Sequence, residues 1–205
     1  MEILKQAFGR CETNCYIAKT NGVTFIIDPG EGSAKWVLEN ASDADAILVT
    51  HGHFDHIWDL YLLKEAFKKI GKDIKIYCPK EDAFMLERDG FNLGLTPCKP
   101  DILIEGKKGV TTLDIKGVKV RFHHFPGHTP GCSMIEIDGV FFSGDFIFKR
   151  SIGRYDFDFS NPQDMKESLK RFQDMHQDGK IYPGHGESTS INDEHASVSI
   201  WLNRM

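Results

Sequence analysis

Hydrophobic positions along the chain follow two patterns. Short continuous apolar runs between turn-forming residues are typical of buried strands, and apolar residues spaced three or four apart are typical of helices. One helical stripe contains Leu60, Leu63 and Phe67, and another contains Met165 and Leu169. The runs predict strands at residues 14–18, 23–27, 46–49, 74–77, 110–115, 118–124, 133–137, 140–142 and 180–183. The stripes predict helices at about 33–39, 57–70, 80–87, 161–176 and 192–202.

Turn-forming residues organise these elements into two halves. Asn21-Gly22, Lys116-Gly117 and Asp138-Gly139 each stand between two strand-like runs and predict tight hairpins. Residues 89–109 hold four of the 19 glycines and two of the eight prolines, which predicts a long surface loop. The order along the chain is strands, helices, strands and helices. Two β-rich halves with helices on their outer sides predict a layered α/β sandwich.

Composition narrows the class of protein. The 205 residues fit a single domain spanning 1–205, and 40% hydrophobic with 27% charged residues is an ordinary balance for a globular chain. The formal charge is −5 without blocks of like charge, so we expect no nucleic-acid and no membrane partner. Five cysteines cannot all pair within the chain, which favours a reducing, cytoplasmic location. The oligomeric state stays open.

A dense run of metal-binding residue types stands where one predicted strand ends and a helix begins. The run is His51-Gly52-His53-Phe54-Asp55-His56. In extended backbone His51 and His53 point the same way and can share one metal ion. The turn into the helix redirects Asp55 and His56 towards a second position nearby. Imidazole and carboxylate ligands suit zinc, iron or manganese, and a solvated histidine-rich loop is the alternative interpretation.

Three later segments supply further ligand types, each after a predicted strand. They are Pro126-Gly127-His128-Thr129-Pro130-Gly131, Ser143-Gly144-Asp145 and Pro183-Gly184-His185-Gly186. Each segment alone is typical of an ordinary turn, because Gly and Pro are turn formers. Strand ends converge on one edge of a sandwich, so we expect His128, Asp145 and His185 to lie near the first motif.

Together these motifs resemble those of the metallo-β-lactamase superfamily, over about residues 14–194. The resemblance implies a four-layer αββα sandwich with two adjacent metal sites and seven protein ligands. The first site takes His51, His53 and His128, the second takes Asp55, His56 and His185, and Asp145 bridges the two.

Within the superfamily the chain resembles the glyoxalase II-like hydrolases, especially the short bacterial type. The similar segments are Gly144-Asp145-Phe146-Ile147-Phe148-Lys149, Ile152-Gly153-Arg154-Tyr155-Asp156-Phe157 and Pro183-Gly184-His185-Gly186-Glu187-Ser188-Thr189. The resemblance implies a dinuclear hydrolase in which a metal-bound hydroxide attacks a thioester, such as a hydroxyacylglutathione, or a related ester. Asp55 and Asp145 are then catalytic through two divalent metal ions, zinc first, with iron or manganese able to use the same ligands.

The charge of such a site favours an anionic substrate. Two divalent ions bring four positive charges, Asp55 and Asp145 remove two, and a bridging hydroxide removes a third, which leaves about one net positive charge. Arg154 and Lys149 follow Asp145 closely and are candidates to hold a substrate carboxylate, with surface ion pairs as the alternative. Longer glyoxalase II enzymes add a helical region that helps recognise glutathione, whereas 20 residues follow His185 here. The carrier thiol and the acyl group therefore stay open.

Other activities also fit the sequence. Persulfide dioxygenases of the same superfamily share Gly153-Arg154 and Asp156-Phe157 and use one iron ion, so an oxidoreductase is the main alternative to a hydrolase. Hydrolysis of a lactone or a β-lactam is compatible with the same ligands. A non-catalytic metal or redox sensor is a further class.

Four residues outside the ligand motifs have competing interpretations. The spacing of Cys11 and Cys15 matches no redox motif, so we expect both to be ordinary small hydrophobic residues. We expect Trp58 to pack under its helix rather than to narrow a pocket. Asp28 either orients a ligand histidine or forms a plain turn.

Overall fold

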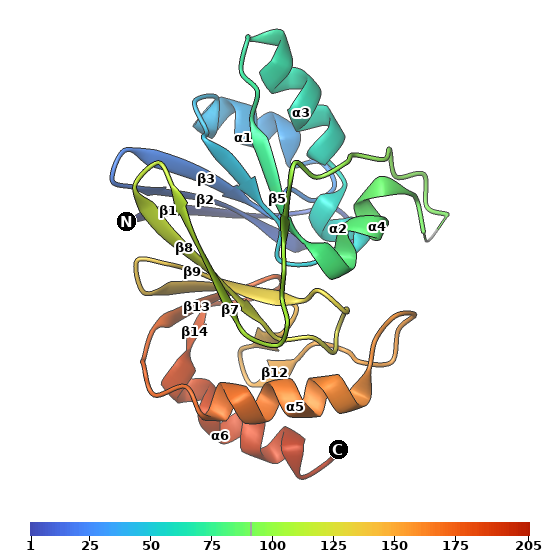
Figure 1. Cartoon of the computed structure of the whole chain (residues 1–205), viewed down its shortest axis with the longest axis vertical. Coiled ribbons are helices and arrows are strands. Elements are labelled where there is room, and N and C mark those ends of the chain that lie inside the picture. The colour runs from blue at the N-terminus through green and yellow to red at the C-terminus, as the bar shows by residue number, and fades with distance from the viewer. Residues whose placement is uncertain (91) are drawn as a thin grey trace.

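The computed structural model describes residues 1–90 and 92–205 of the chain. Two six-stranded sheets lie face to face, and helices cover the outer side of each (Figure 1). The first sheet has the strand order β1–β2–β3–β4–β5–β6, and the second has the order β14–β13–β10–β9–β8–β7. The arrangement confirms the predicted four-layer αββα sandwich.

The helices and strands have the following bounds. The strands are β1 (Glu2–Phe8), β2 (Thr13–Thr20), β3 (Val23–Ile27), β4 (Ala46–Leu48), β5 (Lys75–Pro79), β6 (Ile102–Ile104), β7 (Val110–Ile115), β8 (Val118–His124), β9 (Ser133–Ile137), β10 (Val140–Gly144), β11 (Ile147–Phe148), β12 (Ser151–Ile152), β13 (Lys180–Pro183) and β14 (Thr189–Ser190). The helices are α1 (Ala34–Ala41), α2 (Phe54–Ile57), α3 (Leu60–Lys69), the 3₁₀ helix η1 (Lys80–Asp82), α4 (Ala83–Glu87), α5 (Pro162–Gln173) and α6 (Ile191–Leu202). In the described part of the chain, no helix combines the length and the apolar content that crossing a membrane requires.

Alternate residues of the central strands pack into different cores. In β2, Cys15 and Ile17 pack against the helices of the N-terminal half, whereas Tyr16 packs between the two sheets. In β10, Phe142 faces the core between the sheets and Phe141 faces α5 and α6. Because both faces of these strands are buried, their sequences are continuous apolar runs rather than alternating patterns.

The three predicted hairpins are present. Asn21-Gly22, Lys116-Gly117 and Asp138-Gly139 have positive φ at both residues, as two-residue turns that match the twist of paired strands require. The predicted start of α5 is also confirmed. The side chain of Asn161 accepts hydrogen bonds from two backbone N–H groups of the first turn, and Pro162 occupies that turn.

The structure differs from the predicted elements in several places, among them the short strands β11, β12 and β14 and the division of the helix predicted at 57–70 into α2 and α3. Residues 102–104, within the predicted surface loop, form β6, which pairs with β5 at the edge of the first sheet; residue 91 of that loop lies outside the described residues. The apolar pattern gives no sign of β1, because this edge strand is mostly exposed. Helix α5 ends at Gln173, so His176 lies beyond it and not on its face.

The strands that precede the ligand motifs end at a common rim. β3 and β4 run parallel, which brings Asp28 beside the residues that follow Leu48. β10 and β13 also run parallel, with Gly144 paired to Pro183. The backbone N–H of Asn14 in β2 donates to the carbonyl oxygen of Gly184 at 2.7 Å and joins the two halves at this rim.

Candidate metal centre

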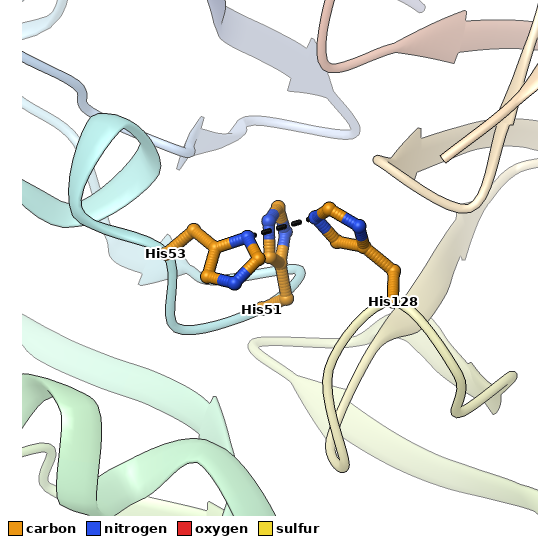
Figure 2. Close-up of side chains that lie close together, drawn as sticks. All are labelled: His51, His53 and His128. Atoms are coloured by element: carbon orange, nitrogen blue, oxygen red, sulfur yellow. Dashed lines mark hydrogen bonds between the residues drawn. The ribbon is translucent and has the colours of Figure 1, made fainter. Parts of the chain in front are cut away.

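Three of the predicted ligands form a buried histidine group. His51 follows β4, His53 precedes α2, and His128 lies in the loop after β8. One ring nitrogen from each lies within 4.8 Å of the others. Figure 2 shows the rings of His53 and His128 facing each other, with His53 Nδ1 2.8 Å from His128 Nε2. Ring nitrogens this close from three sides are suitably placed to share one cation.

Three further predicted ligands form a second group beside the first. Asp55 and His56 lie in the short helix α2, and His185 lies in the loop after β13. One ligand atom from each residue lies within 4.8 Å of the others. His185 Nε2 is 3.4 Å from Asp55 Oδ2, and His56 Nε2 is 3.5 Å from the same oxygen.

Asp145 lies between the two groups. Its Oδ1 is 3.3 Å from His56 Nε2, and its Oδ2 is 3.3 Å from His185 Nε2 and 3.5 Å from His128 Nε2. One carboxylate therefore faces histidines of both groups. The structure brings all seven predicted ligand residues together at the rim.

Asp28 holds the two groups in place from behind. Its Oδ2 is 2.9 Å from His56 Nδ1, and its carboxylate accepts hydrogen bonds from the backbone N–H and the hydroxyl of Thr50 at 2.8 and 2.6 Å. The Thr50 hydroxyl also lies 3.0 Å from His51 Nδ1. Of the two interpretations of Asp28, the structure shows the orienting one, because the contact at His56 Nδ1 directs Nε2 towards the centre.

Backbone carbonyls orient two other histidines. His128 donates from Nδ1 to the carbonyl oxygen of Arg154 at 2.7 Å, and His185 donates from Nδ1 to that of Cys11 at 3.0 Å. Both contacts leave Nε2 facing the centre. The hydroxyl of Thr13 likewise donates to Asp55 Oδ2 at 2.6 Å.

Burial keeps the histidines of the first group neutral. It lowers the pKa of His53 to about 3 and holds the pKa of His51 well below its ordinary value. Burial also lowers the pKa of His128, although Asp145 opposes the shift. These rings therefore offer lone pairs at neutral pH, as metal ligation requires.

Carboxylates reverse this effect in the second group. Burial opposes charge on His56, but Asp55 and Asp145 raise its pKa well above the ordinary value. The same two carboxylates raise the pKa of His185 to about 9, also against burial. Burial would raise the pKa of Asp145, but His56 and His185 hold it well below its usual range. The carboxylates of Asp55 and Asp145 therefore favour a positive charge in the space between them, whether it is carried by a protonated histidine or by a metal ion.

Unsatisfied buried atoms show that the residues fit divalent metal ions. Within the described structure, His51 Nε2, His56 Nε2 and Asp145 Oδ1 are buried and make no hydrogen bond. A buried polar atom without a partner costs about 1–3 kcal/mol, so such atoms seldom cluster without a ligand. The donors are imidazole nitrogens and carboxylate oxygens, which suit zinc, iron or manganese.

Asp82 connects the loop that carries His51 and His53 with the loop that carries His128. Its buried carboxylate accepts hydrogen bonds from Gly52 N at 2.9 Å, from the Thr129 hydroxyl at 2.6 Å and from Gly131 N at 2.6 Å. A Cβ at Gly52 would lie 3.0 Å from the carbonyl oxygen of Asp82, so only glycine fits this approach. No sequence motif singles out Asp82, which stands in η1 far from any ligand along the chain.

A cavity of about 570 Å³ opens beside the ligands. Cys11 lies in the exposed turn between β1 and β2 and lines this cavity, so the prediction that it is an ordinary hydrophobic residue is wrong. Cys15 is buried in the core, as predicted. Trp58 packs against the core of the N-terminal half and does not line the cavity, which confirms the packing interpretation.

The two predicted substrate contacts are both paired with carboxylates. Arg154 lines the cavity, and its Nε and Nη2 donate to the two oxygens of Asp156 at 2.9 Å each. Lys149 does not line the cavity, and its Nζ is 2.5 Å from Glu187 Oε2.

Comparison with known proteins places this centre in a family. The model of the metallo-β-lactamase superfamily matches residues 8–185. The chain is 32% identical over 186 residues to the hydroxyacylglutathione hydrolase GloC of Haemophilus influenzae, with 84% of each chain covered. The crystal structure of the BLEG-1 B3 metallo-β-lactamase matches with a TM-score of 0.81 and 27% identity, covering 95% of this chain and 97% of that one. The di-iron-bound form of TTHA1623 matches with a TM-score of 0.77 and 29% identity, covering 95% and 98%.

The family model spans most of the chain, and the fold and the grouped histidines and aspartates agree with it. The chain therefore belongs to the metallo-β-lactamase superfamily.

Proposed function

We propose that this chain is a dinuclear metal-dependent hydrolase that cleaves a thioester or a related ester. Water adds to the carbonyl carbon, the bond from that carbon to sulfur or oxygen breaks, and a carboxylic acid and a thiol or alcohol are released. The observation that carries the proposal is the convergence of two ligand groups, with Asp145 between them, on one open cavity.

The proposed metal ligands are His51, His53 and His128 for one ion and Asp55, His56 and His185 for the other, with Asp145 bridging. When bound, divalent metal ions lower the pKa of water towards ~7 and stabilise negative charge on a carbonyl oxygen. The chain's own contribution is placement, since Asp28, Thr13 and two backbone carbonyls fix the ligand atoms before any substrate arrives.

Two relatives support the choice of substrate and metal. The relative from Haemophilus influenzae is named as a hydroxyacylglutathione hydrolase, so a thioester is the first substrate to test. The structure of TTHA1623 in a di-iron-bound form makes iron a candidate beside zinc and manganese. A cytoplasmic location is part of the same proposal, and all five cysteines are free thiols.

The test combines elemental analysis of the purified protein with turnover of S-lactoylglutathione. We expect two metal ions per chain and hydrolysis at neutral pH. Asp145→Ala removes the carboxylate that faces both groups, so we expect activity to fall at least about 100-fold. Asp43→Ala, a change at an exposed carboxylate, is the matched control. Retained activity of the Asp145 variant at full metal occupancy would refute the bridging role.

The same protein preparation separates this proposal from the main alternative. One iron ion per chain, with oxygen uptake on glutathione persulfide and no thioester hydrolysis, would identify a persulfide dioxygenase instead. If the protein hydrolyses a lactone or a β-lactam faster than every thioester tested, the substrate is a lactone or a β-lactam, and the assignment of the metal ligands is unchanged. Metal-loaded protein without activity on any ester or thioester would favour a non-catalytic module.

A further inference from the structure

The walls of the cavity beside the ligands are largely apolar. The ring of Phe157 lies edge-to-face against two proposed ligands, with centroids 5.8 Å from His53 and 6.0 Å from His128. The ring of Phe148, which also lines the cavity, lies 5.9 Å from the ring of His185 in the second group. An aromatic ring of the lining therefore lies beside each ligand group.

The ring of Phe157 is supported by Arg154 and Asp156. The guanidinium carbon of Arg154 lies 4.1 Å from the centroid of the Phe157 ring. Asp156 holds that guanidinium through two hydrogen bonds of 2.9 Å. The bidentate pair and the cation–π contact together place the guanidinium over the Phe157 ring. Phe157 nevertheless leaves 41% of its surface exposed, which is apolar area without a protein partner to cover it.

The two cationic side chains that were candidates to hold a substrate carboxylate are already paired with carboxylates of the chain. Among the described residues that line the cavity, Arg154 is the single arginine or lysine, and Asp156 already neutralises it. Lys149 lies outside the lining and is paired with Glu187. Asp158 adds a further carboxylate to the lining. Binding energy outside the metal centre must therefore come mainly from apolar contact.

We propose that the substrate carries an extended alkyl or aryl group, longer than two carbons, on at least one side of its carbonyl, and that Phe157 is the residue that selects for it. The proposal rests on the proposed hydrolase function and names the substrate class of the same site. Arg154 then acts as a positioning residue for the Phe157 ring and not as the partner of a substrate carboxylate.

The test uses two pairs of neutral thioesters with the metal-loaded protein. S-ethyl hexanethioate is compared with S-ethyl ethanethioate, and S-hexyl ethanethioate is compared with the same short compound. Each longer compound adds four methylenes on one side of the carbonyl without changing the reacting bond. Partial burial of those methylenes in an open cavity predicts a kcat/KM about tenfold higher for the longer member of at least one pair.

Phe157→Ala removes the apolar surface that is inferred to contact the longer chain, so the ratio of kcat/KM between the long and the short thioester is expected to fall to about twofold. Phe159→Ala is the matched control on the same loop. Phe159 is also exposed, but its ring packs against Phe84 with centroids 5.1 Å apart and does not line the cavity. We expect the control variant to keep the full preference.

Calorimetric titration supplies a readout that does not depend on turnover. Hexanoate is expected to bind the metal-loaded protein about tenfold more tightly than acetate, and Phe157→Ala is expected to abolish the difference. Equal kcat/KM values within both thioester pairs, or a preference that survives Phe157→Ala, would overturn the inference while the hydrolase function stands. Hydrolysis of S-lactoylglutathione but of none of the three thioesters would also overturn the inference, whereas failure to hydrolyse S-lactoylglutathione and all three thioesters would contradict the proposed function.

Discussion

Five of the seven proposed ligands contact a polar neighbour that orients them: His51, Asp55, His56, His128 and His185. Asp28 shows this most clearly, because one carboxylate contacts His56 and also both the backbone and the hydroxyl of Thr50. Asp28 has a φ of 50°, in the left-handed region, where aspartate is one of the few residues found besides glycine. The strand end is therefore shaped to place this carboxylate behind the ligands.

Asp28→Asn is expected to weaken metal binding about 10- to 100-fold. The amide has one acceptor oxygen in place of two, so at least one of the contacts to Thr50 or His56 is lost and His56 is oriented less firmly. A competition titration against a chromophoric chelator measures the affinity. Asp45→Asn is the control, since Asp45 also accepts a backbone N–H, from Thr24, away from the centre. Equal affinities in the two variants would contradict the role of Asp28.

At the scale of elements, η1 joins loops that are far apart in sequence. Asp82 at its end binds one loop through Gly52 and the other through Thr129 and Gly131. Removing its carboxylate leaves three buried donors without their acceptor. Asp82 thereby aligns two segments of the first histidine group without touching a ligand side chain.

Asp82→Ala is expected to lower the free energy of unfolding of the metal-free protein by about 3 kcal/mol near pH 7. Burial raises the pKa of Asp82 to about 6 in the folded chain, against 3.8 for an ordinary aspartate, although its hydrogen bonds oppose the shift. As pH rises through this window the unfolded chain loses the proton first, so the contribution of Asp82 to stability declines. The cost of the substitution is therefore expected to be larger at about pH 4 than at about pH 7.

Chemical denaturation at the two pH values measures this difference. Asp114→Ala provides the comparison, because the Asp114 side chain accepts one backbone N–H, from Gly117, in an exposed turn. That variant is expected to change stability by less than about 1 kcal/mol at both pH values. A cost for Asp82→Ala that grows with pH would show that the carboxylate is not held in its neutral form by burial.

The sequence predicts the strands and the ligand motifs well for one shared reason. The central strands are apolar on both faces, and each ligand motif follows directly after such a strand. The end of an apolar run in the sequence therefore marks both the end of a strand and the position of a ligand motif. Hydrogen bonds that backbone carbonyl groups accept cannot be predicted from the residue types in the sequence. The carbonyl groups of Cys11 and Arg154 orient His185 and His128, but any residue type could supply a carbonyl. The role of Asp82 could not be predicted from the sequence either, because its hydrogen-bond partners lie 30 to 49 residues away along the chain.

At the scale of the whole molecule, the metal centre lies at the junction of the two halves. His51, His53, Asp55 and His56 belong to the half built on the first sheet. His128, Asp145 and His185 belong to the half built on the second. Bound metal ions would therefore add a link between the halves beside the hydrogen bonds that already join them at this rim, such as Asn14 N to Gly184 O and Gly131 N to Asp82. We expect metal binding to strengthen the association of the two sheets.

Addition of Zn²⁺ to the metal-free protein is expected to raise Tm by about 5–10 °C at a free concentration of 100 times Kd. Differential scanning calorimetry measures the shift. Mg²⁺ at the same concentration is the control, and we expect no comparable effect because Mg²⁺ prefers oxygen ligands to imidazole. An equal rise with both ions would point to general charge screening of the carboxylates rather than to ligation by the histidines.

The β11–β12 hairpin and the turn that follows it stand between Asp145 and α5. This stretch supplies Phe148, Ile152 and Phe157 to the cavity but none of the proposed metal ligands. Two points tie it to the centre: the carbonyl oxygen of Arg154 holds His128, and a Cβ on Gly153 would lie 1.7 Å from the carbonyl oxygen of Asp145. Apart from the proposed ligands themselves, the side chains that line the cavity and those that would hold metal therefore come largely from different segments. Substitutions at Phe148, Ile152 or Phe157 would change the shape offered to a substrate without removing a proposed ligand.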